Sequence, residues 1–132
     1  MGRVQVGVAA IITKDGKFLI GKRKSDHGNG TWGLVGGHLE FQESFEGCVI
    51  REAKEEAGIA VADLDVIEVT NDIFPEKHYI TVFLIGSASD EPRLMEPDKF
   101  ERWEWRDWDD MPEPLFLPFK TLVESGFRPA GL

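Results

Sequence analysis

Apolar and polar residues follow the period of two that strands have over the first part of the chain. Residues 3–12 are rich in valine and isoleucine, first alternating and then continuous, which predicts a strand that becomes buried on both faces. Residues 14–16 (KDG) are a turn signal, and residues 17–23 predict the partner strand of a hairpin. Residues 25–31 are rich in glycine, aspartate and asparagine and indicate a loop.

The period changes to that of a helix at residues 44–57. Four apolar side chains recur every four residues and predict one buried stripe: Phe45, Val49, Ala53 and Ala57. Ser44 is suited to the N-cap position, where its hydroxyl accepts a hydrogen bond from a free backbone N–H group. Gly58 is suited to the left-handed position that ends many helices.

The rest of the chain predicts three strands and a final helix, at residues 64–73, 78–85, 101–108 and 116–125. A turn at residues 74–77 makes the first two of these strands a second hairpin, and residues 87–99 read as a polar loop. Strands on both sides of one helix, with a second helix at the end, predict an α/β fold with a mixed sheet between helices. A length of 132 residues predicts one domain.

The chain is acidic, with a formal charge of −9. Because proteins bind DNA and RNA largely through Lys and Arg, we expect no nucleic-acid polymer as partner. A small anionic substrate remains compatible with this charge if metal ions connect it to the protein. Lys22, Arg23 and Lys24 form one local basic group, which is either a solvated strand end or a contact for a phosphate or a base.

Cys48 is the single cysteine, so no disulfide can form within the chain, which fits a reducing compartment. No basic-then-apolar leader is visible at the N-terminus, and no apolar run approaches the ~18 residues of a membrane-spanning helix. We therefore expect a cytoplasmic protein that does not interact with membranes.

Three carboxylates fall at i, i+3 and i+4 of the predicted helix: Glu52, Glu55 and Glu56. We call these three residues the acidic ridge. Side chains at this spacing are neighbours, and like charges so placed repel one another. A bound cation would reverse that cost, and oxygen ligands select hard divalent ions such as Mg²⁺ or Mn²⁺. The alternative is a solvated acidic helix, although Glu52 and Glu56 wind to positions beside the apolar stripe.

The acidic ridge belongs to a longer pattern of fixed positions: Gly37-x5-Glu43-x7-Arg51-Glu52-x2-Glu55-Glu56-x-Gly58-Ile59. This pattern resembles the Nudix box, here residues 37–59, of the Nudix hydrolase superfamily. Further segments, including residues 21–24, 36–41 and 78–81, resemble the subgroup of MutT-like nucleoside triphosphate pyrophosphohydrolases. The resemblance implies one Nudix domain over residues 1–132, folded as an α/β/α sandwich with a mixed sheet.

The resemblance also implies an activity and its residues. The reaction would be metal-dependent cleavage of a nucleoside triphosphate, including oxidised or modified ones, to the monophosphate and pyrophosphate. The implied catalytic residues are Glu43, Arg51, Glu52, Glu55 and Glu56. Glu52, Glu56 and the Gly36 carbonyl would bind Mg²⁺ or Mn²⁺, and Glu55 would be a third ligand or the base that takes a proton from water. Arg51 would orient Glu43, and one later-strand acid, Glu101 or Glu104, could join the metal.

The substrate-binding residues implied by the resemblance are Arg23, Gly36, Gly37, His38, Thr81, Phe116 and Leu117. Thr81, Phe116 and Leu117 match positions that contact the base in the subgroup, although Phe116 could equally belong to the core. His38 adjoins the glycine pair and is a candidate for phosphate contact or for packing within the turn. Members of the subgroup tend to be homodimers, so the resemblance implies a homodimer here.

Two other functions compete with this hypothesis. The Nudix box also serves nucleotide-sugar and ADP-ribose pyrophosphatases, although 132 residues leave little room for extra recognition segments. A Nudix-shaped module that binds a nucleotide without hydrolysing it usually lacks a catalytic glutamate, whereas all three glutamates of the acidic ridge are present here.

Overall fold

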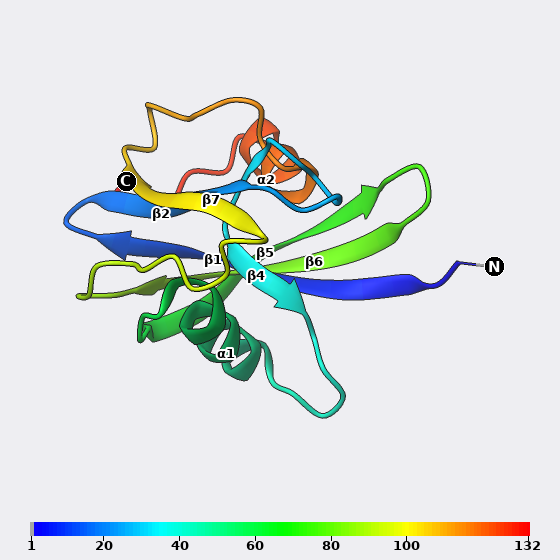
Figure 1. Ribbon diagram of the computed structural model, residues 1–132, viewed down its shortest axis with the longest axis horizontal. Coiled ribbons are helices and arrows are strands. Elements are labelled where there is room, and N and C mark those ends of the chain that lie inside the picture. Colours follow the sequence, from blue (N-terminus) through cyan, green and yellow to red (C-terminus); the bar gives the residue numbers. More distant parts are fainter. Residues whose placement is uncertain (1) are drawn as a thin grey trace.

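The structure is a computed structural model and describes residues 2–132. Seven strands and two helices follow one another along these residues (Figure 1): β1 (Val4–Lys14), β2 (Lys17–Arg23), β3 (Trp32–Gly33), β4 (Val35–His38), α1 (Phe45–Ala57), β5 (Ala62–Ile73), β6 (His78–Ser87), β7 (Phe100–Arg106) and α2 (Leu117–Glu124). Both predicted hairpins are present, and every predicted strand and helix is confirmed within a few residues of its expected ends.

The strands form one seven-stranded mixed sheet in which β1 is central. β1 pairs in parallel with β6 and antiparallel with both β2 and β4. The β1–β2 hairpin is paired only near its turn, so further along β1 the same edge is free to pair with β4. Because β2 instead pairs with β3 and β7, the sheet divides between β2 and β4. The functional residues described below gather around this division.

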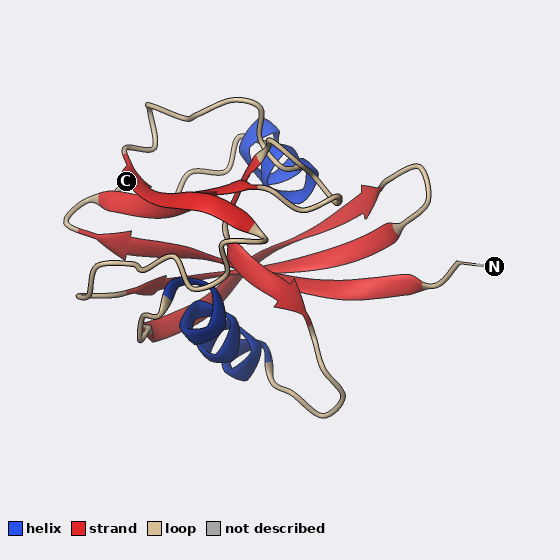
Figure 2. Ribbon diagram, viewed as in Figure 1, coloured by secondary structure: helices blue, strands red, loops and turns tan. Residues whose placement is uncertain are grey.

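The two helices cover opposite faces of the sheet (Figure 2). α1 packs its Val49 and Ala53 into a core cluster that includes Ala10 of β1, whereas α2 packs Phe119 into a second cluster that includes Ile11 of β1. Neighbouring residues of β1 thus enter different cores, as expected for a strand buried on both faces. This arrangement confirms the predicted α/β/α sandwich with a mixed sheet between helices.

Helix α1 begins and ends at the predicted caps. The Ser44 hydroxyl accepts a hydrogen bond of 2.9 Å from the N–H group of Gly47, and Gly58 has the left-handed φ of 64°. A Cβ on Gly47 would lie 2.9 Å from the Ser44 hydroxyl, so glycine at this position keeps the cap undisturbed. The prediction that Phe45 belongs to the buried stripe is wrong: its exposed fraction is 36%, because the first turn of the helix extends beyond the core.

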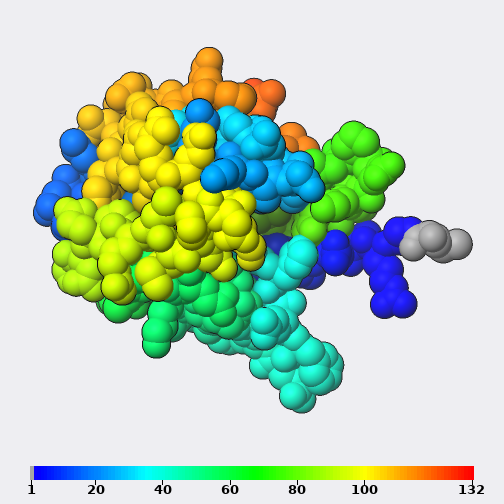
Figure 3. Space-filling view, viewed as in Figure 1, coloured from blue at the N-terminus to red at the C-terminus, as the bar shows by residue number. Residues whose placement is uncertain are grey.

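The segment between β4 and α1 projects from the body of the molecule, as the cyan atoms in Figure 3 show. Phe41 in this segment is 92% exposed. No helix in the described part of the chain is long and apolar enough to cross a membrane.

Candidate active site

The three carboxylates of the acidic ridge lie in different surroundings. Glu56 is buried, with 6% of its surface exposed. The side chain of Glu52 is 13% exposed and that of Glu55 is 51% exposed. Glu55 and Glu56 are adjacent in the helix, so their side chains point in different directions. Glu56 points toward the sheet and Glu55 toward solvent. The sequence predicted their proximity and placed Glu52 and Glu56 beside the buried apolar stripe, which the low exposure of both side chains confirms.

Glu52 and Glu56 both meet Gly36 and Gly37, which the structure places in strand β4, paired with β1. We use the name glycine turn for this pair, because β4 ends at the next residue, His38. The N–H group of Gly36 donates a hydrogen bond of 3.0 Å to Glu56 Oε1. The carboxyl group of Glu52 lies against Gly37, where an added Cβ would stand 2.6 Å from the carboxyl carbon. A side chain at Gly37 would push Glu52 away, whereas one at Gly36 would meet the backbone of Val8 and Ala9 in β1. Gly37 therefore lets Glu52 lie against β4, and Gly36 lets β4 lie close to β1.

Arg51 joins the acids of the box. Its Nε and Nη2 atoms donate hydrogen bonds of 2.8 and 3.0 Å to the two carboxylate oxygens of Glu43. Its Nη1 atom donates to Glu52 Oε1 at 2.5 Å and lies 3.4 Å from Glu55 Oε2. The guanidinium holds the pKa of Glu43 at about 2, and the contacts with Glu43 and Glu52 raise the pKa of Arg51. The contact implied between Arg51 and Glu43 is therefore formed, and it is bidentate.

Burial and mutual repulsion disfavour the charged forms of Glu52 and Glu56, which we call the inner acids. Burial, and then the neighbouring charge of Glu52, raises the pKa of Glu56 well above its ordinary value. Burial also raises the pKa of Glu52, against the opposing effect of Arg51. The charge of Glu96, on the loop after β6, raises the pKa of both. Glu96 is therefore a third acid within electrostatic reach, and one that the sequence analysis missed.

The donors near the glycine turn are all oxygens, and the inner acids carry unfavourable negative charge that a cation would relieve. These residues therefore fit a hard divalent ion. Within residues 2–132, however, no three His, Cys, Asp or Glu side chains converge closely enough to hold one. The implied ligand set of Glu52, Glu55 and Glu56 is not preassembled, because Glu52 and Glu55 face the Arg51 guanidinium.

A pocket of about 470 Å³ opens beside the glycine turn, a size typical of small-ligand sites. Gly36, Gly37, Arg51, Glu52 and Glu56 line one end of it. Four rings line another part and form what we call the aromatic wall: His27, Phe74, Tyr79 and Phe116. The pocket thus combines an acidic end with a surface suited to a flat ring.

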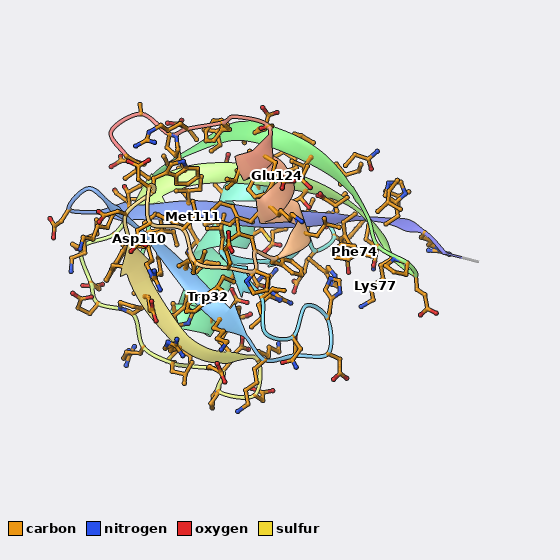
Figure 4. The ribbon with its side chains drawn as sticks, turned by 90° about the horizontal axis from the view of Figure 1, so that it is seen from above. Trp32, Phe74, Lys77, Asp110, Met111 and Glu124 are labelled. Carbon is orange, nitrogen blue, oxygen red and sulfur yellow. The ribbon has the colours of Figure 1, made fainter. Side chains whose placement is uncertain are left out.

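The aromatic wall is assembled from four separate segments. The ring of His27 lies 4.6 Å from that of Phe74 and 5.2 Å from that of Phe116, centroid to centroid. Phe74 and Tyr79 lie edge to face at 6.0 Å. In Figure 4 Phe74 and Lys77 lie together at the turn between β5 and β6, and both line the pocket. Burial, followed by the charges of Lys77 and Arg23, lowers the pKa of His27 to about 4, so this ring is neutral at pH 7.

Arg23 lies between the aromatic wall and the acids. Its guanidinium carbon is 4.0 Å from the ring centroid of Phe116, and its Nε atom donates to the His27 carbonyl at 3.1 Å. Burial lowers the pKa of Arg23, whereas the charges of Glu56 and Tyr79 raise it. The basic group at the end of β2 thus supplies one cation inside the pocket, while Lys22 pairs with Glu101.

The structure gathers most, but not all, of the predicted site residues. Thr81, His38 and Phe116 line the pocket, and His38 stacks on Tyr79 and forms a 2.7 Å hydrogen bond with its hydroxyl group. The residues of the prediction that do not line the pocket are Glu43, Glu55, Glu101, Glu104 and Leu117.

Glu101 and Glu104, the two candidates for a later-strand ligand, are engaged elsewhere. Glu101 lies 3.3 Å from Lys22, and Glu104 lies between Arg102 and Arg106 at 2.6 and 2.9 Å. Neither was found near the inner acids, whereas the charge of Glu96, five residues before Glu101, acts on both Glu52 and Glu56. No spacing in the sequence marked Glu96, because its loop reaches α1 through backbone bonds such as that from Met95 N–H to the Glu56 carbonyl.

The chain belongs to the Nudix family, since the family model described as NUDIX domain matches residues 1–124. It is 35% identical over 122 residues to the ADP-ribose pyrophosphatase of Methanocaldococcus jannaschii, an alignment that covers 90% of this chain and 71% of the relative. It is 27% identical over 133 residues to the 8-oxo-dGTP diphosphatase of Escherichia coli, covering 99% and 92% of the two chains.

The fold has a close match among solved structures. A MutT NUDIX hydrolase from Burkholderia pseudomallei superposes with a TM-score of 0.86 at 35% identity, over 92% of this chain and 97% of the other. Family and fold together make the chain a Nudix hydrolase that acts on phosphoric anhydride bonds. Nudix hydrolases generally need divalent metal ions, which agrees with the all-oxygen donors beside the glycine turn.

Proposed function

We propose that the protein hydrolyses a nucleoside triphosphate, including oxidised or modified forms, to the monophosphate and pyrophosphate. The observation that carries this proposal is the single pocket that joins the glycine turn and inner acids to the aromatic wall. A ring seated on the aromatic wall would extend its phosphate chain toward Glu52 and Glu56. The name of the Escherichia coli relative, 8-oxo-dGTP diphosphatase, supports the same substrate class.

A divalent cation would be held by Glu52, Glu56 and the Gly36 carbonyl. When bound there, Mg²⁺ or Mn²⁺ would neutralise charge on the phosphates and lower the pKa of a coordinated water. Arg51 holds Glu43 and Glu52 in place before substrate binds. Glu55 lies outside the pocket lining, so either of its implied roles, third ligand or base, requires its side chain to turn toward Glu52.

Four cationic side chains line the same pocket: Arg23, Arg51, Lys77 and Lys99. Arg51 is already paired with Glu43 and Glu52. We assign Arg23 to the substrate side, because its guanidinium contacts a neutral ring, a backbone carbonyl and a hydroxyl, and no carboxylate in residues 2–132 lies within ion-pair distance of it. A phosphate oxygen or a base oxygen would give its buried charge a partner. Thr81 and Phe116 would contact the base from β6 and from the start of α2.

A second candidate is ADP-ribose hydrolysis. It is favoured by the Methanocaldococcus jannaschii relative, which is named an ADP-ribose pyrophosphatase and shares 35% identity with this chain. Both reactions break a phosphoric anhydride beside a nucleoside, so the acidic end of the pocket would serve either. They differ in what must be held beyond the second phosphate, a further phosphate or a ribose.

The test is product identification with a panel of substrates. Purified protein with Mg²⁺ or Mn²⁺ is given canonical, oxidised and methylated nucleoside triphosphates and ADP-ribose, in water enriched in oxygen-18. We expect pyrophosphate and a nucleoside monophosphate, and the labelled product identifies the phosphorus attacked. Release of AMP and ribose phosphate alone would favour the second candidate. Binding that raises the melting temperature without any hydrolysis would instead indicate a nucleotide-binding module.

Matched variants connect the activity to the acidic ridge. Glu52→Gln and Glu56→Gln should each abolish most turnover, whereas Glu46→Gln, an exposed acid of the same helix, should leave turnover unchanged. Equal loss in all three variants would contradict the assigned site. The homodimer implied by the resemblance stays a prediction, which sedimentation of the same preparation would check.

A further inference from the structure

One buried carboxylate near the pocket has no assigned role. Asp72 of β5 is 1% exposed, and its Oδ2 atom accepts a hydrogen bond of 2.5 Å from the Thr70 hydroxyl. Its Oδ1 atom is buried without a hydrogen-bond partner, and it is the one such side-chain atom found among the described residues. Leaving a carboxylate oxygen buried without a donor is costly, so it persists where something else satisfies it.

The sheet register places this carboxylate beside the nucleotide pocket. Asp72 is directly opposite Tyr79, and Thr70 is directly opposite Thr81. Directly opposed residues of antiparallel strands project from the same face of the sheet. Tyr79 and Thr81 both line the pocket, so Thr70 and Asp72 extend that face by one strand. Their neighbours in the sequence, Asn71 and Ile73, are exposed, as expected for the other face.

The aromatic wall continues past the same carboxylate. Phe74 follows Asp72 by two residues and lies in the half-exposed turn between β5 and β6. The helix that covers this face, α2, packs against β5 and contributes Pro118 and Phe119 to the pocket lining. Asp72 itself does not line the open pocket, so a ring would reach it only if the side chains that cover it moved aside.

We propose that Asp72, steadied by Thr70, is the residue that selects the base: its free oxygen accepts hydrogen bonds from adjacent N–H groups on the edge of a guanine-type ring. This inference rests on the proposed function, since it assumes a nucleotide base on the aromatic wall. An ionised carboxylate accepts hydrogen bonds and donates none, so it favours an edge with donors. Guanine presents two neighbouring donors, N1–H and the 2-amino group, whereas adenine presents an acceptor at N1.

The selectivity can be measured by binding alone. GMP and IMP differ only in the 2-amino group, and AMP removes both neighbouring donors, so these three monophosphates are the probes for calorimetric titration. We expect the unaltered protein to bind GMP about five- to a hundredfold more tightly than IMP or AMP, the range set by one good base-edge pair. In Asp72→Asn that preference should fall by about tenfold or more, because a neutral amide oxygen is a weaker acceptor than a carboxylate oxygen, and an amide turned the other way presents a donor to the N–H groups.

The matched control is Asp65→Asn, the same chemical change at an exposed position of the same strand, which should retain the preference. Thr70→Val removes the hydroxyl that steadies Asp72 and should weaken GMP binding more than IMP binding, which supplies a second readout if Asp72→Asn folds poorly.

Two results would overturn the inference. One is an unaltered protein that binds GMP, IMP and AMP equally. The other is an Asp72→Asn variant whose melting temperature changes while its base preference does not, which would mean that a buried water satisfies Oδ1. Pyrophosphate release is scored separately: hydrolysis without base preference contradicts only the role of Asp72, and base preference without hydrolysis contradicts only the proposed reaction.

Discussion

The backbone N–H group of Gly36 donates a 3.0 Å hydrogen bond to the carboxylate of Glu56. This bond joins β4 to α1 at the point where the pocket begins, and it uses one carboxylate oxygen of a buried acid. The Trp103 indole donates to the Glu56 carbonyl at 3.1 Å, so the same residue is held from β7 as well. Glu56 is therefore positioned by three elements of the fold, while its second oxygen remains available to a ligand.

The two glycines of the turn should respond differently to substitution by alanine. A Cβ on Gly37 would meet the Glu52 carboxylate, which can move, whereas a Cβ on Gly36 would meet the backbone oxygen of Val8 and would stand 2.9 Å from the Ala9 Cα atom. We expect Gly37→Ala to fold normally and lose most activity. Gly36→Ala should lower stability by about 1–3 kcal/mol, as overpacking does.

Thermal melting and steady-state kinetics of the two variants check this prediction. Gly2→Ala is the control, since no atom lies within 4 Å of the added Cβ. A Gly37→Ala protein with full activity would show that Glu52 need not lie against the glycine turn.

The ionised carboxylate of Glu43 should stabilise the folded protein at neutral pH, and this contribution should be lost in acid. Arg51 lowers the pKa of Glu43 from 4.5 to about 2 in the folded protein. As the pH falls, the unfolded chain therefore binds the proton first, so this contribution is complete above pH 4.5 and is lost by about pH 2. Melting temperatures of the parent and of Glu43→Gln should differ at neutral pH and converge between these two values. A difference that persists at pH 2 would point to a cause other than this ionisation.

The aromatic wall should contribute to binding more than to turnover. Phe74→Ala removes a ring of the pocket, and stacking on such a ring is worth about 1–3 kcal/mol per base. We expect KM to rise by about five- to a hundredfold with kcat little changed, the pattern of an interaction made equally in the ground and transition states. Phe41→Ala is the control, because Phe41 is 92% exposed and does not line the pocket. Equal effects of the two substitutions would argue against a base on this surface.

The elements of the fold were predictable because their signals are local. Ser44 and Gly58 marked the ends of α1, and alternation marked both hairpins. The failure at Phe45 has a tertiary cause, since its helical position is right but the core ends before the first turn. Helical spacing placed Glu52 and Glu56 beside the buried stripe, but it did not show that Glu56 would be almost fully buried.

The pocket was only partly predictable, because its residues meet through long-range pairing. His27 and Tyr79 of the pocket wall, and Glu96 near the inner acids, lie on three separate segments, and no interval between them signals contact. Tyr79 is two residues before Thr81 on β6, so strand alternation could have added it to the predicted base contacts. His27 lies in a loop whose composition indicated only a turn, and its place beside Phe74 follows from the folded chain alone.

Glu96 should affect the response to metal. Its charge acts on Glu52 and Glu56, and it is paired with Lys99 at 3.5 Å. If a cation binds beside the glycine turn, a third negative group strengthens that binding, and losing it should raise the Mg²⁺ concentration for half-maximal activity by about tenfold, as loss of an outer-shell partner does. Glu96→Gln is compared with Asp98→Asn, an exposed acid of the same loop, by titrating Mg²⁺ at saturating substrate. If Glu96→Gln leaves the Mg²⁺ concentration for half-maximal activity unchanged, then Glu96 does not contribute to metal binding.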